Sequence, residues 1–171
     1  MADFAHAIDN VLAHEGGFVD HESDPGGATN WGISSRFLAG VGDDRDVRNL
    51  SRADAIELYR VHFWERYRYE DLPDGISTKV FNISVNTGPA TAHKVLQRAL
   101  RATGAHVADD GVLGAITLRA AREADPGQLI AAMRSEQAGY YRYLIGRRRK
   151  LGVFRNGWLK RAYEDGILPT L

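Results

Sequence analysis

Apolar residues recur at helical spacing through most of this chain, and glycine or proline pairs end most of these runs. The first run places its apolar residues on one face, at Phe4, Ile8, Val11 and Leu12. Residues 3–14 are therefore predicted to form an amphipathic helix that stops at Gly16-Gly17. Only residues 18–34, dense in Asp, Gly, Asn and Thr, lack this period. The pattern predicts a mainly α fold with a long loop or small β-hairpin at about residues 18–34.

Further helices are predicted from their start and stop signals. Ser51 and Asp54 form a candidate capping box for a helix that reaches about Arg66, and residues 76–87 are apolar on most faces, as in a central buried helix. Pro89 opens the next helix, and Asp125 caps a long one that reaches about Gly146. Residues 109–114 are predicted to form a turn before a short helix, and residues 154–171 a loop, a short helix around 158–163 and a frayed end.

Composition excludes several classes of protein. The chain has 171 residues with no cysteine, so disulfides, thiolate zinc sites and cysteine nucleophiles are excluded. Its formal net charge is zero, which argues against a general nucleic-acid binder. The charge is divided, however: residues 1–75 carry 15 acidic and 7 basic residues, and residues 76–171 carry 7 acidic and 15 basic residues.

Targeting signals are not recognised in the sequence. The first 17 residues carry acids and histidines where a signal peptide has basic residues and then an apolar run. No apolar stretch is long enough to span a membrane. We therefore expect synthesis in the cytoplasm without a signal peptide, and no stable membrane insertion.

Two carboxylates in the first 24 residues form the strongest candidate for chemistry. Glu15 is predicted at a helix C-terminus, where the dipole disfavours the ionised form and is expected to raise its pKa. A carboxyl group that stays protonated suits a glycosidase general acid, and Asp24 supplies a second carboxylate in the following loop. Taken separately, a solvated helix-end glutamate and an Asp-capped turn explain these residues. Together, in a long acidic loop, they favour paired-carboxylate chemistry.

The same segment resembles a known family. The run Glu15-Gly-Gly-Phe, followed by Asp24-Pro-Gly-Gly-Ala-Thr-Asn-Trp-Gly-Ile33, resembles the signature of glycoside hydrolase family 108, lysozyme-like N-acetylmuramidases of phage endolysins and bacterial genomes. Later blocks also resemble it, at Trp64 with Tyr69 and Leu72-Pro73, and at residues 80–88. Residues 96–97, 110–117 and 154–161 resemble the peptidoglycan-binding segment that usually follows.

The resemblance implies roles for individual residues. Glu15 falls on the family's general acid, and Glu15, Asp24 and Thr29 resemble the Glu/Asp/Thr triad of phage-type lysozymes. The last gap is one residue shorter than usual, so Thr29 and Asn30 both remain candidates for the third catalytic position. Asn82 stands where many relatives have Asp, and a polar contact near the cleft is expected to differ there.

The implied reaction is hydrolysis of the β-1,4 bond between N-acetylmuramic acid and N-acetylglucosamine in peptidoglycan. Glu15 would protonate the departing oxygen, and Asp24, with Thr29 helping to hold a water, would act as base or as electrostatic stabiliser. The product is inverted if a water lies between the two carboxylates and retained if Asp24 attacks directly. The sequence leaves both outcomes open.

A glycan groove needs aromatic faces and amides, and the candidates for substrate binding are Asn30, Trp31, Tyr69, Asn82 and Asn86. Core packing is an equal alternative for Trp31 and Tyr69. Asn82 and Asn86 lie one helical turn apart, and Asn86 is the better placed to face the cleft.

No metal or cofactor is expected. His14, Asp20 and His21 flank the candidate acids but match no established ligand spacing, and hydrolysis by two carboxylates needs no metal. Residues 109–111 lack the later acids of a calcium-binding loop and are interpreted as a turn.

The basic run Arg147–Lys150 is interpreted mainly as a solvated helix end, with a weaker role in attraction to an anionic envelope. A nucleic-acid-binding role would rest on this run alone and lacks a motif. The expected partner is peptidoglycan and not nucleic acid, and we expect a monomer that depends on a separate pore-forming protein for its release to the periplasm and cell wall.

Two segments are predicted to pack as one unit, a lysozyme-like catalytic core at residues 1–88 and a helical peptidoglycan-binding segment at 89–171. The leading hypothesis is a peptidoglycan hydrolase that acts in cell lysis. The alternative is a non-catalytic peptidoglycan-binding or secretion-associated protein on the same fold.

Overall fold

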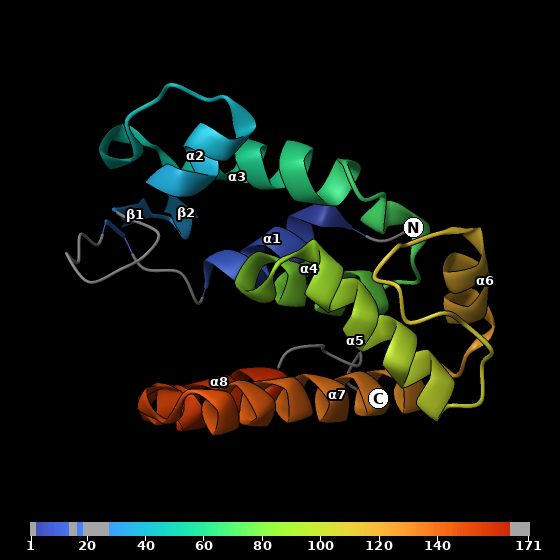
Figure 1. The fold of residues 1–171 in the computed structure, drawn as a ribbon. Helices are drawn as coiled ribbons and strands as arrows, with labels where there is room; N and C mark the ends of the chain where they lie inside the picture. Colours follow the sequence, from blue (N-terminus) through green and yellow to red (C-terminus); the bar gives the residue numbers. More distant parts are fainter. Residues whose placement is uncertain (1–2, 14–16, 19–27, 165–171) are drawn as a thin grey trace.

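The computed structural model describes residues 3–13, 17–18 and 28–164, and most of them are helical (Figure 1). The α-helices are α1 (Phe4–Leu12), α2 (Ser35–Val41), α3 (Arg52–Tyr59), α4 (Ile76–Thr87), α5 (Pro89–Ala102), α6 (Ala115–Glu123), α7 (Pro126–Arg147) and α8 (Arg155–Glu164). Shorter helical turns are η1 (Val47–Asn49), η2 (Arg60–Glu65), η3 (Tyr69–Asp71) and η4 (Arg149–Phe154). Strands β1 (Thr29–Asn30) and β2 (Ile33–Ser34) pair antiparallel. The prediction of a mainly α fold with a small hairpin inside residues 18–34 is confirmed.

Helix starts follow the capping chemistry of the sequence. Ser51 and Asp54 form the predicted capping box, in which each side chain accepts a hydrogen bond from the other's backbone N–H. Asp125 caps α7 by accepting from the Gln128 N–H at 2.8 Å, with Pro126 in the first turn. These local signals account for where the helices begin.

The helix predicted to reach Arg66 changes character on the way. The α-helix α3 ends at Tyr59, and the chain continues through the π-helical turn η2. The wider turn lets Phe63 and Trp64, neighbours in sequence, both pack on aromatic rings. Phe63 stacks on Phe37 at 5.5 Å between ring centroids, and Trp64 meets Phe81 edge-on at 5.5 Å. Packing against Phe37 of α2 and Phe81 of α4 explains this departure from the predicted helix.

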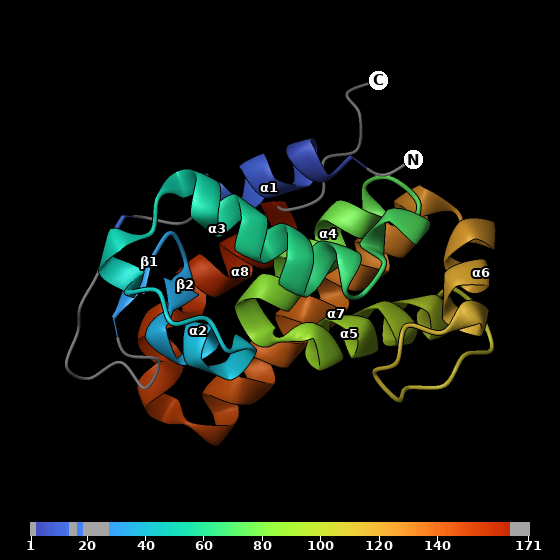
Figure 2. The ribbon, with the colours of Figure 1, turned by 90° about the horizontal axis from the view of Figure 1, so that it is seen from above.

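Helix α4 lies at the centre of the molecule, as predicted, and contacts α1, α5 and α7 (Figures 1 and 2). Its residues from Ile76 to Ser84 are all buried. One of them is charged: the Lys79 Nζ donates to the Ala162 carbonyl of α8 at 2.9 Å. The main core runs from Ala7 in α1 to Met133 in α7, so both predicted segments contribute to it.

Residues 138–163, named here the arm, comprise the second half of α7, η4 and α8, and the two helices lie side by side (Figures 1 and 2). The arm has its own small core of Ala138, Tyr141 and Ala162. The predicted loop from Phe154 is wrong, because α8 already begins at Arg155. The stacking of Trp158 on Tyr141, with centroids 5.1 Å apart, stabilises helix where the sequence signals are weak.

Candidate functional site

The two candidate carboxylates, Glu15 and Asp24, lie outside the described residues, and their catalytic roles stay predictions. The structure describes what lies on both sides of them. Helix α1 ends at Leu12, with Ala13 as its C-cap, and the continuous description resumes at Ala28, directly before β1 begins at Thr29. The candidate site is therefore built from this frame.

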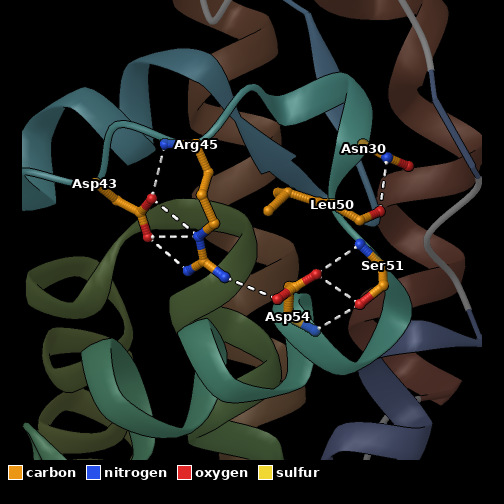
Figure 3. A network of polar contacts seen from close by, with 6 residues as sticks. All are labelled: Asn30, Asp43, Arg45, Leu50, Ser51 and Asp54. Atoms are coloured by element: carbon orange, nitrogen blue, oxygen red, sulfur yellow. Dashed lines mark hydrogen bonds and ion pairs between the residues drawn. The ribbon is translucent and has the colours of Figure 1, made fainter.

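The hairpin is fixed to the rest of the fold by Asn30. Asn30 is only 6% exposed, and its amide nitrogen donates to the Leu50 carbonyl at 3.1 Å (Figure 3). The same nitrogen also donates to the Val47 carbonyl at 3.1 Å. A buried amide bonded to two carbonyls holds β1 against η1 and the start of α3. The substrate-binding role of Asn30 stays a prediction. In the structure its amide nitrogen makes hydrogen bonds within the fold.

Trp31 forms the hairpin turn with Gly32, and both have positive φ, at 52° and 77°. This is the left-handed region, which glycine adopts freely and which costs a tryptophan on the order of 1 kcal/mol. The Tyr59 hydroxyl donates to the Trp31 carbonyl at 3.2 Å and stabilises the turn. Trp31 is half-buried and packs against the core, and part of its surface remains accessible. Its position is therefore compatible with both core packing and contact with a ligand.

A network around Arg45 braces the loop that receives the Asn30 bonds (Figure 3). The Arg45 guanidinium binds Asp43 at 2.5 Å and Asp54 at 2.8 Å. Its hydrogen bonds lower the pKa of Asp43 to about 2, and bonds from Ser51 lower the pKa of Asp54. Sequence reasoning missed this network, although Arg45 stands among Asp43, Asp44 and Asp46, a short distance before the capping box.

The last turn of α4 carries the two candidate asparagines. Asn86 is exposed, and its amide nitrogen donates to the Asn82 carbonyl at 2.8 Å and to the Asn82 Oδ1 at 3.2 Å. Asn82 itself is 3% exposed. The two side chains thus share one helix face, as their spacing indicates. Asn86 is the one that a ligand can reach, and Asn82 positions it.

Tyr69 has no exposed surface. It packs between Trp64 and Phe81, and its hydroxyl lies 3.0 Å from the His93 Nε2. Burial raises the pKa of Tyr69 and lowers the pKa of His93. The position favours core packing, the alternative that the sequence left open, because no ring face is accessible to a sugar.

His93 belongs to a cluster of polar contacts that holds residues 109–114. These residues form no helix or strand, in agreement with the predicted turn. The Gln97 side chain donates to Asp110 at 2.7 Å and accepts from the Gly111 N–H at 2.8 Å. Gly111 has φ of 78°, and a Cβ there would lie 3.0 Å from the Ala90 carbonyl oxygen, so glycine is required. The turn is locked onto α5.

A groove of about 470 Å³ lies between α5 and α7. Its lining combines aromatic rings and charges, and comprises Thr91, Lys94, Val95, Arg98, Glu136, Gly139, Tyr140 and Tyr143. Tyr143 is 59% exposed, so its ring faces solvent. Sequence reasoning missed this groove; the available signal was the spacing of Glu136, Tyr140 and Tyr143 on one face of α7.

Comparison with known proteins accounts for both segments. Residues 8–88 match the family model described as "Glycosyl hydrolase 108", and residues 91–163 match the "Predicted Peptidoglycan domain". Among solved structures, the "Structure of Brucella abortus SagA" is 30% identical, with a TM-score of 0.73 and 98% of each chain covered. The chain belongs to the glycosyl hydrolase 108 family. No curated protein matches it.

Family membership makes the protein a glycoside hydrolase associated with peptidoglycan. The matched range of the glycosyl hydrolase 108 model contains Glu15, Asp24 and the hairpin, and the range of the second model contains the groove between α5 and α7. The candidate carboxylates and the groove thus fall in different family segments.

In the described part of the chain, no group of three or more His, Asp and Glu side chains is arranged to hold a metal ion. His14, Asp20 and His21 lie outside that part, so the expectation of metal-free hydrolysis stays a prediction. None of the described helices is both long enough and apolar enough to cross a membrane.

Proposed function

We propose that this protein is an N-acetylmuramidase that cleaves the β-1,4 bond between N-acetylmuramic acid and N-acetylglucosamine. The match of residues 8–88 to the glycosyl hydrolase 108 model carries the proposal, because that range contains Glu15-Gly-Gly and Asp24-Pro-Gly-Gly. Glu15 acts as the general acid that protonates the leaving oxygen. Asp24 acts on the opposite face of the sugar, as base or as electrostatic stabiliser.

Thr29 is assigned to the third catalytic position in preference to Asn30. The Asn30 amide nitrogen is committed to two backbone carbonyls, so turning it toward a substrate would leave those acceptors without their donor. Thr29 precedes it on β1 and is only half-buried. Asn86 is assigned to a sugar amide or hydroxyl group, and the half-buried Trp31 ring to a pyranose face.

The groove between α5 and α7 is assigned to wall binding. Tyr140 and Tyr143 offer ring faces to sugars, and Lys94 with Glu136 offers both charges to the carboxylates and amines of stem peptides. Binding there would keep the enzyme on an insoluble polymer between cleavage events. Tyr143→Ala is expected to reduce co-sedimentation with peptidoglycan while leaving cleavage of short soluble glycans unchanged.

The decisive test is clearing of a suspension of purified peptidoglycan by the wild type, Glu15→Gln and the control Glu123→Gln. We expect the wild type and the control to clear equally, and Glu15→Gln to be slower by roughly 10²–10⁴-fold, since it removes the proton donor. Mass analysis of the fragments should show reducing ends on N-acetylmuramic acid. Reducing ends on N-acetylglucosamine would make it a glucosaminidase, and cuts confined to stem peptides would refute a glycosidase.

We also propose that the monomeric protein is made in the cytoplasm and reaches the wall through a pore formed by another protein. The resemblance to endolysins supports this route. Expression in bacteria should cause lysis only when a pore-forming membrane protein is co-expressed. Lysis by the enzyme alone would refute the dependence.

A further inference from the structure

The arm carries an unusual distribution of charge. Residues 138–163 contain eight Lys and Arg residues and no Asp or Glu. The bases concentrate where α7 passes into η4 and α8, at the tip of the arm. Such a block is a candidate surface for an anionic partner.

Three of these arginines converge on one pocket. Arg142, Arg149 and Arg155 line a cavity of about 450 Å³, together with Ile145, Gly146 and Gly152. No ion pair between any of the three and a carboxylate is found within residues 3–13, 17–18 and 28–164. Helix α8 begins at Arg155, so the positive end of its dipole adds to the same site. Guanidinium groups arranged in this way match the oxygens of a phosphate group.

Apolar side chains project beside this pocket. Val153 is 81% exposed and Phe154 is 51% exposed, and both lie in η4 between Arg149 and Arg155. Phe154 stacks on Trp158, with centroids 5.5 Å apart and an interplanar angle of 19°, which fixes its ring. Exposed apolar residues bordered by basic ones are the pattern of a peripheral membrane contact.

We propose that the tip of the arm, residues 142–155, docks on a membrane surface rich in anionic phospholipid. The three arginines bind a headgroup phosphate, and Val153 and Phe154 enter the interfacial layer. A nucleic acid or a soluble phosphate would satisfy the arginines but leave both apolar side chains in water, so the lipid surface fits more of the structure. The contact is peripheral and is independent of the hydrolytic reaction.

The test is co-sedimentation with vesicles of equal parts phosphatidylglycerol and phosphatidylcholine, and with vesicles of phosphatidylcholine alone. The wild type should bind only the anionic vesicles. The triple variant R142Q/R149Q/R155Q should bind about a hundredfold more weakly, from roughly fivefold for each charge near the surface. Circular dichroism should show unchanged helix content, because all three side chains are exposed.

A charge-matched control is R36Q/R101Q/R119Q, which removes three exposed arginines elsewhere. It should bind the anionic vesicles within about threefold of the wild type, because surface charge far from the contact is screened. Equal weakening of the two triple variants would overturn the proposal in favour of general charge attraction. Equal binding of the wild type to both kinds of vesicle would also overturn it.

The apolar contribution is tested with V153S/F154S. Its binding should fall roughly tenfold, and the residual binding of the wild type at high salt should be lost, because apolar contacts are not screened. If V153S/F154S binds the anionic vesicles like the wild type, the site recognises phosphate alone and the membrane proposal fails.

Discussion

Helix α4 and the arm are held in place by different amounts of packing. The α4 residues from Ile76 to Ser84 are buried without interruption, and helices from both family segments surround them. The arm has a separate small cluster of Ala138, Tyr141 and Ala162, and it leaves Val153 and Phe154 at its tip exposed. The comparison teaches that the region framing the candidate chemistry is fixed by long-range packing, while the arm is free to present side chains to a partner.

The largest expected difference is between truncations in the two regions. Phe81→Ala removes a ring packed against Phe4, Tyr59, Trp64 and Tyr69, and should lower the free energy of unfolding by about 3–5 kcal/mol. Trp158→Ala should cost about half as much, because its ring is half-buried. Urea unfolding measures the loss of stability in each variant. Hydrogen exchange should show that the arm opens before the rest of the protein in Trp158→Ala. Equal losses in one cooperative transition would show that the arm is no weaker than the core.

The second prediction concerns the two asparagines that frame the site. Asn30→Ala removes the donor to the Val47 and Leu50 carbonyls and should lower the free energy of unfolding by about 1–3 kcal/mol. Its rate of clearing peptidoglycan should fall as well, because the hairpin loses its attachment. Asn86→Ala should change stability by less than about 0.5 kcal/mol, since Asn86 is exposed and packs little apolar surface. Similar thermal stability of the two variants would contradict the structural role of Asn30.

The third prediction tests the junction between the two segments, where Tyr69 meets His93. Burial lowers the pKa of His93 below 6.5, so below about pH 6.5 the unfolded chain takes up a proton that the native protein resists. Stability should therefore decrease as the pH falls from about 6.5 toward the lowered pKa, and this contribution is constant above that range. Thermal melts at several pH values should show a weaker decline for His93→Gln. Parallel curves for the variant and the wild type would exclude His93 as the source of this pH dependence.

The smallest expected effect is at Arg45, because the network is at the surface. Arg45→Gln should reduce the melting temperature slightly at low salt, and the difference should disappear at high salt. Replacement of Asp44, which has no role in the network, is the matched control. A large loss that persists at high salt would mean that Arg45 holds the hairpin loop by more than charge.

Sequence alone accounted for much of the fold where the cause is local. The capping box at Ser51 and Asp54, the Asp125 cap and the breaker at Gly88-Pro89 each act through neighbours in the chain, and the predicted helix starts followed from them. The shift to a π-helical turn after Tyr59 and the early start of α8 were missed. Both depend on aromatic partners that are distant in sequence, Phe81 and Tyr141 respectively.

By itself, the sequence determined the mainly helical class, the hairpin inside residues 18–34 and the family that carries Glu15 and Asp24. Those properties follow from periodicity, capping and a local motif. Only the tertiary structure decided that Tyr69 is buried, that Asn30 bonds η1, and that three arginines share a pocket beside exposed apolar residues. The physical reason is that the burial of a side chain, and its proximity to other side chains, depend on which elements distant in sequence pack together. Local sequence patterns do not specify that packing.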